Sequence, residues 1–172
     1  MFKAIAIGLM LAAAPMALSA QSAAPNDAQI AHIAYTAGQL DIAAAKQALA
    51  KSKDKEVRSF AEEMIRDHAA VNDQALALVK KLGVTPQDNP TSQSLSANAA
   101  AELKTLDKLS GKAFDKAYVA NEAAYHKTVN GALQSTLIPN ARNGELKSLL
   151  QTGLKLFTEH QQHAEHVAGA LR

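Results

Sequence analysis

Apolar residues recur every three or four positions through almost the whole chain after residue 26, and this spacing constrains the fold more than any other feature. It places apolar side chains on one face of an α-helix, whereas a half-buried strand needs alternation at every second position. No segment shows convincing alternation between turns. The chain is therefore predicted to be all-α, with long helices over residues 27–51, 54–83, 112–137 and 144–170 and a shorter one over 95–109.

The breaks between these segments indicate how the helices connect. The segment "VTPQDNPTSQS" holds two prolines and several capping residues, so it predicts a loop long enough to cross the end of a bundle. Gly83 suits a helix C-terminus. Pro139 predicts that the third long helix stops before it, because the residue preceding a proline disfavours helical backbone. Two hairpins joined by a longer crossover, which contains the short extra helix, describe a four-helix bundle.

The first twenty residues have the pattern of an export signal. Lys3 supplies a positive charge, residues 4–14 are apolar, and small residues precede the expected cleavage after Ala20, with cleavage after Ser19 as the alternative. The apolar run is too short to span a membrane, and no later run of about 18 apolar residues replaces it. We expect a signal peptide over residues 1–20, a single bundle domain over 21–172 without a transmembrane segment, and a periplasmic or secreted location.

Charge and cysteine content narrow the classes of function. The chain has 18 Lys and Arg residues, and removal of Lys3 leaves 17 basic against 16 acidic residues. A nucleic-acid-binding protein needs a concentrated basic face, so no nucleic-acid partner is expected. There are no cysteines, which excludes disulfides and thiolate metal ligands. The sequence identifies no protein partner.

Several ionisable residues fall on the apolar stripes of the long helices. Asp41 follows Ala37 by four positions and His68 follows Met64 by four positions, so both face inward. The third and fourth long helices carry ionisable residues at comparable inward positions, and all lie nearer mid-helix than the ends. We predict a shared polar layer of Asp41, His68, Glu122, His126 and His160.

This polar layer has two interpretations. Carboxylate and imidazole groups that converge in a bundle core build metal sites in such folds, and they suit zinc, copper or iron. Alternatively, the same groups form a satisfied hydrogen-bond network, since buried polar groups need partners whether or not they bind anything. The sequence leaves both interpretations open.

The remaining histidines are predicted to lie in solvent. In the tail "EHQQHAEH", His163 could share a face with neighbouring ligands, but His166 points mostly outward. His32 is also expected to be exposed. Asp67 adjoins His68, yet adjacent helical residues point about 100° apart, so Asp67 need not orient that ring.

Three parts of the sequence resemble one family of exported bacterial proteins. They are the stretch from "TAGQLDIAAAKQALAK" through "FAEEMIRDH", then "SGKAFDKAYVANEAAYHKTV", then "LKLFTEHQQHAEHV". They look like the family catalogued as domain of unknown function 4142, which is placed with the ferritin-like four-helix bundles. The resemblance covers essentially the whole mature chain and implies that fold. The family has His at the positions of His68, His126 and His160, and usually Glu where this chain has the shorter Asp41.

The resemblance does not extend to a di-iron centre. Ferritin-like di-iron proteins use Glu-x-x-His motifs, whereas Ile65, Ala123 and Phe157 stand three residues before the three inward histidines. A standard di-iron centre is therefore not expected, and superfamily membership supports the fold rather than an activity. The chain also lacks a phosphate-binding glycine loop, a nucleophile elbow and an HExxH motif.

These observations favour an exported, non-enzymatic helical bundle with a divalent-metal or polar-network site in its core. One alternative is a redox or hydrolytic enzyme that uses a bound metal with an open position. Another is a structural or stress-related protein of the cell envelope, in which the polar layer only fixes helix register.

Overall fold

The structure is a computed structural model that describes residues 24–171, and it is built from helices. The predicted signal peptide lies outside the described residues. No strand occurs between residues 24 and 171, which confirms the all-α class. The elements in chain order are α1 (Asp27–Lys51), α2 (Lys55–Lys81), α3 (Pro90–Asp107), α4 (Gly111–Ala132), the π-helical turn η1 (Leu133–Leu137), α5 (Ile138–Asn140) and α6 (Gly144–Ala170).

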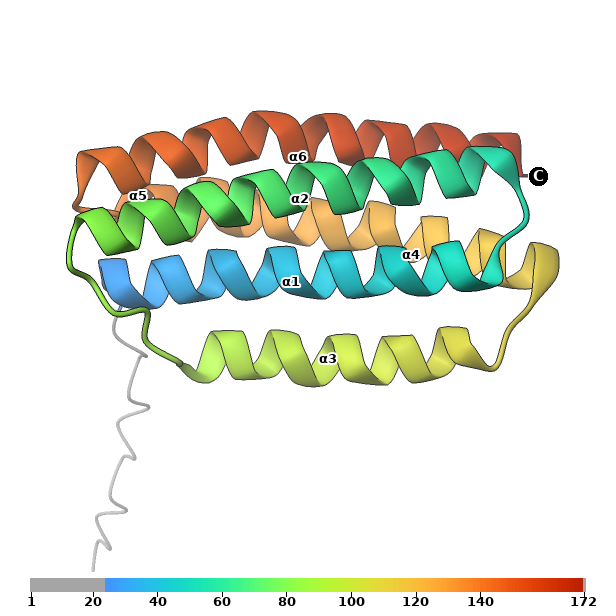
Figure 1. Ribbon diagram of the computed structural model, residues 1–172, viewed down its shortest axis with the longest axis horizontal. Coiled ribbons are helices and arrows are strands. Elements are labelled where there is room, and N and C mark those ends of the chain that lie inside the picture. Colours follow the sequence, from blue (N-terminus) through green and yellow to red (C-terminus); the bar gives the residue numbers. More distant parts are fainter. Residues whose placement is uncertain (1–23, 172) are drawn as a thin grey trace, which may run out of the picture.

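Helices α1, α2, α4 and α6 form the four-helix bundle, and α3 lies outside it beside α1 (Figure 1). The pairs α1–α2 and α4–α6 are antiparallel hairpins. Because α2 ends and α4 begins at opposite ends of the bundle, α3 carries the crossover along its full length. This arrangement is the predicted ferritin-like bundle with an extra helix between the second and third bundle helices. No helix in the described part of the chain has both the length and the apolarity to cross a membrane.

Side-chain caps fix where four helices begin. Asn26 and Gln29 form a reciprocal capping box at α1, and Asp54, Asn89 and Asn143 accept hydrogen bonds from the first backbone amides of α2, α3 and α6. Such caps satisfy amides that have no partner within the helix and typically contribute about 1 kcal/mol each.

The extra helix begins earlier than the sequence pattern predicts. It starts at Pro90 rather than near residue 95, because Asn89 caps it and a proline fits the first helical position, where no N–H is required. The segment "PTSQS" is therefore helical although its composition is typical of a loop. The loop between α2 and α3 is correspondingly shorter than predicted.

The prediction that the third long helix stops before Pro139 is wrong. Ile138 has helical backbone angles of φ −63° and ψ −46°, and its N–H donates to the carbonyl of Leu133, five residues back. Proline lacks an N–H, and its ring crowds the carbonyl four residues earlier. The wider π turn relieves that crowding, so the chain stays helical through Asn140.

Two apolar clusters fill the bundle on either side of its middle. The cluster toward the α1–α2 turn includes Ala45, Ala48, Val57, Phe60, Met64, Phe114, Tyr118 and Val167. The cluster toward the opposite end includes Ile30, Ile33, Leu133, Leu137, Leu146 and Leu150. Full burial of a large apolar side chain contributes about 1.5–3 kcal/mol, so these clusters hold the four helices together. The predicted polar layer lies between them.

Candidate functional site

Every bundle helix contributes to a buried polar layer. Asp41 comes from α1, His68 from α2, Glu122 and His126 from α4, and His160 from α6. Each of the five residues is at most 4% exposed. All five predicted site residues therefore face the interior.

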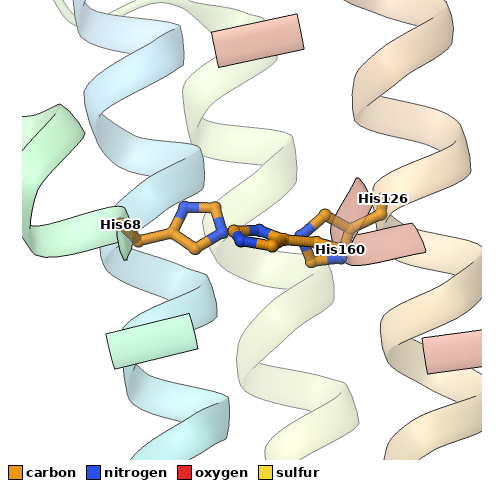
Figure 2. A group of neighbouring side chains, drawn as sticks. All are labelled: His68, His126 and His160. Atoms are coloured by element: carbon orange, nitrogen blue, oxygen red, sulfur yellow. The ribbon is translucent and has the colours of Figure 1, made fainter. Parts of the chain in front are cut away.

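The three histidines of this layer converge on one point. Figure 2 shows the rings of His68, His126 and His160 reaching toward one another from separate helices. The centroid of the His68 ring lies 5.6 Å from that of His126 and 5.3 Å from that of His160, and the other two are 5.4 Å apart. One nitrogen from each ring lies within 4.8 Å of the other two.

Asp41 lies next to the three histidines and comes from α1, the remaining bundle helix. Its Oδ2 atom lies 3.3 Å from Nε2 of His68 and 3.3 Å from Nε2 of His126. The Glu122 carboxylate is adjacent, with Oε2 3.7 Å from Nδ1 of His126. Asp41, Glu122 and His126 also offer three ligand-type atoms within 4.8 Å of one another.

Most of the donor and acceptor atoms at the centre of the layer lack hydrogen-bond partners among residues 24–171. These atoms are Oδ1 and Oδ2 of Asp41, Nδ1 and Nε2 of His68, Nε2 of His126, Nδ1 of His160 and Oε2 of Glu122. Buried polar groups in native proteins are nearly always paired, so a cluster of unpaired ones requires a physical explanation. Either interpretation of the sequence, a bound cation or a hydrogen-bond network, has to satisfy these atoms.

Hydrogen bonds on the outer side of two rings define which nitrogens face inward. Nδ1 of His126 lies 3.0 Å from the backbone carbonyl of Glu122, which can only accept, so Nδ1 carries the proton and Nε2 presents a lone pair. Nε2 of His160 donates to Oδ2 of Asp67 at 3.1 Å, which leaves Nδ1 as the inward atom. The third ring, His68, is held by stacking on Phe157 with a centroid separation of 4.7 Å.

Burial sets the protonation of the layer. Loss of water raises the pKa of Asp41 from 3.8 to about 8. Burial and, after it, the nearby Asp41 raise the pKa of Glu122 well above its ordinary value. Without a cation in the layer, both carboxyl groups therefore favour their protonated forms more than exposed carboxyl groups do.

The imidazoles shift in the opposite direction. Burial lowers the pKa of His126 to about 4, and burial followed by the proximity of His126 and His160 lowers that of His68. Burial also lowers the pKa of His160, although the hydrogen bond to Asp67 opposes the change. Neutral imidazoles are the form that binds metal ions.

A cavity of about 310 Å³ reaches the carboxylate side of the layer between α1, α3 and α4. Asp41 and Glu122 line it from the inside, and Tyr125 and the half-buried Glu102 line it further out. The cavity therefore borders the layer on the side covered by α3, although the Asp41 and Glu122 side chains are at most 1% exposed.

Asp67 contacts the layer in a way that the sequence interpretation did not predict. It does not orient the neighbouring His68 ring, as expected, but the same 100° offset aims it at α6, where it binds His160. Burial alone would raise the pKa of Asp67, but hydrogen bonds from Arg66 and His160 outweigh it and lower that pKa. The sequence feature that could have indicated this contact is an acidic residue directly before an inward histidine on α2.

The histidines outside the layer differ in exposure. His166 is exposed, as predicted. His163 is only half-exposed, and its Nδ1 lies 2.6 Å from Oε2 of Glu63. His32 is also half-buried, 3.9 Å from a carboxylate oxygen of Asp88, so the expectation that it lies in solvent is wrong. Neither ring joins the layer, because each faces a carboxylate on the outside of the bundle.

The fold and the layer define a class of protein, an all-α four-helix bundle with a buried imidazole–carboxylate centre. The chain belongs to the family described as Domain of unknown function (DUF4142), which matches residues 12–167. A crystal structure described as a secreted DUF305 protein from Streptomyces coelicolor has a similar fold, with a TM-score of 0.70 and 13% sequence identity over 83% of this chain and 91% of that chain. None of the curated proteins matches this sequence.

Proposed function

We propose that this protein binds one divalent transition-metal ion between Asp41, His68, His126 and His160, with Glu122 next to the ion. The observation that carries the proposal is the set of buried donor atoms that point at one another without partners among the described residues. A cation placed between them binds one ligand atom from each of several residues at once, whereas a single proton on Asp41 can serve only one of the two facing imidazoles.

The separations between ligand atoms support this assignment. A tetrahedral ion with bonds of about 2.0–2.1 Å holds neighbouring ligand atoms about 3.3 Å apart. Oδ2 of Asp41 has this separation from Nε2 of both His68 and His126. The three imidazole nitrogens lie within 4.8 Å of one another, so closing them onto one ion takes side-chain adjustment and no change of fold.

The outer hydrogen bonds also match those of metal sites. Ligating histidines usually donate their second ring N–H to a carbonyl or carboxylate, which fixes the tautomer and makes the ligand more basic. His126 does this with the carbonyl of Glu122, and His160 with the carboxylate of Asp67. Both rings therefore present a lone pair to the centre of the layer.

The ligand set favours a binding role over catalysis. Three imidazoles and one carboxylate suit zinc, copper or iron, and four protein ligands leave no open position on a tetrahedral ion. The chain has no Glu-x-x-His motif, so a ferritin-type di-iron centre is not part of the proposal. With the N-terminal export pattern, the proposed role is to hold a metal ion in the periplasm or outside the cell.

The direct test is metal analysis of protein purified without a His tag. We expect close to one equivalent of zinc, copper or iron per chain, and an affinity more than about 100-fold weaker in His68→Ala. His166→Ala is the matched control, because His166 is exposed on the outside of α6. Equally negligible metal in the unaltered protein and in His68→Ala, after exposure to each ion in turn, would exclude the proposal.

One observation favours a second candidate, a metal-dependent enzyme. The 310 Å³ cavity is lined in part by Asp41 and Glu122, whose side chains are at most 1% exposed, so movement of these two side chains would bring a small substrate to the ion. If Glu122 stays off the ion, it is placed to act as a general base. Cobalt-substituted protein tests this candidate, because an absorption spectrum that is insensitive to azide would rule out an exchangeable ligand position.

A further inference from the structure

A large apolar cavity lies on one side of the polar layer and plays no part in the proposed metal site. Its volume is about 530 Å³, which falls within the range of about 300–1,000 Å³ for small-molecule pockets. It occupies the bundle half that holds the second apolar cluster. On α6 its lining runs from Leu146 to Phe157, a rise of about 16 Å, so the space is elongated along the bundle.

Small side chains leave this space unfilled. Each of the four bundle helices contributes at least one to the wall, namely Ala34, Ala37 and Gly38 from α1, Ala75 from α2, Ala132 from α4 and Gly153 from α6. Protein interiors are normally packed as densely as organic crystals, and a void costs stability in proportion to its volume. An occupant would restore the dispersion contacts that the wall lacks.

The wall determines what kind of molecule fits. Among the residues that the structure describes, no charged side chain lines the cavity, and most of the wall is aliphatic. An apolar wall of this kind favours an apolar occupant. The cavity opens to solvent at the N-terminal ends of α1 and α3 and along α4 and η1, where exposed residues line it: Ala24, Pro90, Thr91, Thr128, Ala132 and Thr136.

One polar group lies at the inner end of the cavity, next to the polar layer. Asn72 is 3% exposed and lines the cavity one turn after His68. Its Nδ2 has no hydrogen-bond partner within residues 24–171. The amide packs directly on Gly38, where a Cβ atom would lie 2.6 Å from Oδ1 of Asn72. An unpaired buried donor is costly, and an acceptor on a ligand would satisfy it.

We propose that this cavity binds an elongated, neutral, apolar molecule with one hydrogen-bond acceptor, such as a ketone or ester oxygen, that accepts from Nδ2 of Asn72. The apolar body fills the space bounded by the small residues, and the oxygen meets the only buried, unpaired donor among the described residues of the wall. None of the proposed metal ligands lines this cavity, so binding does not depend on a metal.

Titration of N-phenylnaphthylamine, a neutral apolar fluorophore, into protein kept metal-free with a chelator tests the cavity. We expect saturable binding that weakens at least about tenfold in Ala34→Leu and Ala75→Leu, which place a larger side chain in the space. Ala99→Leu is the matched control, because Ala99 lines the neighbouring cavity beneath α3 but not this one, and it should bind as the unaltered protein does. Absence of saturable binding, or equal binding by all three variants, would overturn the proposal.

A measurement on the unaltered protein guards against variants that fail to fold. The unfolding temperature should rise with fluorophore concentration, because a ligand of the native state stabilises it by mass action. No rise at concentrations that saturate the fluorescence would overturn the assignment to this cavity.

The acceptor is tested by competition between methyl heptyl ketone and nonane, which have similar shapes. The ketone should displace the fluorophore roughly fivefold more effectively, beyond its difference in water solubility, as expected for one buried hydrogen bond. Asn72→Leu should abolish that preference. Equal preference in the unaltered protein and in Asn72→Leu would show that Asn72 does not bind the ligand.

Discussion

Oδ2 of Asp41 lies 3.3 Å from Nε2 of His126, on the side of the ring opposite the Nδ1–H that donates to the Glu122 carbonyl. Two electron-rich atoms therefore face each other in a buried space. A proton on Asp41 or a cation between the two atoms removes the repulsion. The raised pKa of Asp41 is the consequence of burial in the metal-free chain, so a metal ion has to displace that proton in order to bind.

The first prediction concerns the Asp41 carboxylate. Asp41→Asn keeps the size of the side chain but removes the only negatively charged ligand of the proposed set, so the metal affinity should fall more than about 100-fold. Calorimetric titration with Zn²⁺ measures it. The control is Asp115→Asn, which alters a carboxyl group that is 5% exposed on the same helix as His126 but outside the layer. Similar affinities for the two variants would contradict the assignment of Asp41.

The second prediction concerns the support of His160. Asp67→Asn weakens the acceptor for Nε2–H of His160 and should reduce metal affinity by roughly 10–100-fold without removing a ligand. Asp73→Asn, on the exposed face of α2, should have no effect on affinity. Competition with a chelating dye gives both values, and an unchanged affinity in Asp67→Asn would show that this contact does not orient the ring.

The third prediction separates a metal site from a layer that only fixes helix register. In chelator, His68→Leu should unfold at the same temperature as the unaltered protein or higher, since an unpaired buried imidazole is replaced by an apolar side chain. Added metal should raise the unfolding temperature of the unaltered protein only. If metal stabilises neither protein, the register interpretation is favoured.

The fourth prediction is a pH dependence of the metal-free protein. A carboxyl pKa raised from 3.8 to about 8 on folding contributes stability below pH 3.8, and this contribution is lost as the pH rises toward 8. The shift at Glu122 has the same sign. The lowered pKa values of His68 and His126 act in the opposite sense. They make the folded protein less stable only as the pH falls below about 6.5.

Between pH 6.5 and 8 the carboxyl groups therefore dominate, and the chelated protein should lose stability by at most about 1.4 kcal/mol per pH unit for each proton. Asp41→Asn should show a smaller loss over this interval. Urea unfolding at a series of pH values gives the slopes, and identical slopes for the two proteins would contradict a raised pKa at Asp41.

Periodicity alone located the bundle helices and the inward residues, because burial of one helix face is a local property of the sequence. Asp41 and His68 were identifiable by their places on apolar stripes. The distance between Asp41 and His68 cannot be predicted from the sequence, since it depends on the rotation and height of the packed helices. The partnership of Asp67 with His160 was missed for the same reason, as it joins residues 93 positions apart.

The extent of α3 was missed because its first turn consists of residues that are typical of loops. The Asn89 cap and Pro90 at the first position are nevertheless the local signals of a helix start. Its Ser and Thr residues lie mostly in solvent, so no apolar stripe marks this turn.

The π turn η1 sets the rotational phase of the chain where it leaves α4. Leu133, Leu137 and Ala141 are all buried although they recur at a strict spacing of four. In an ordinary α-helix that spacing drifts by about 40° at each step, which would carry the third side chain toward solvent. One additional residue in the turn absorbs the drift. Deletion of a single residue between 133 and 137 would consequently turn Ala141 and the start of α6 out of phase with the bundle, while the helices before η1 keep their own registration.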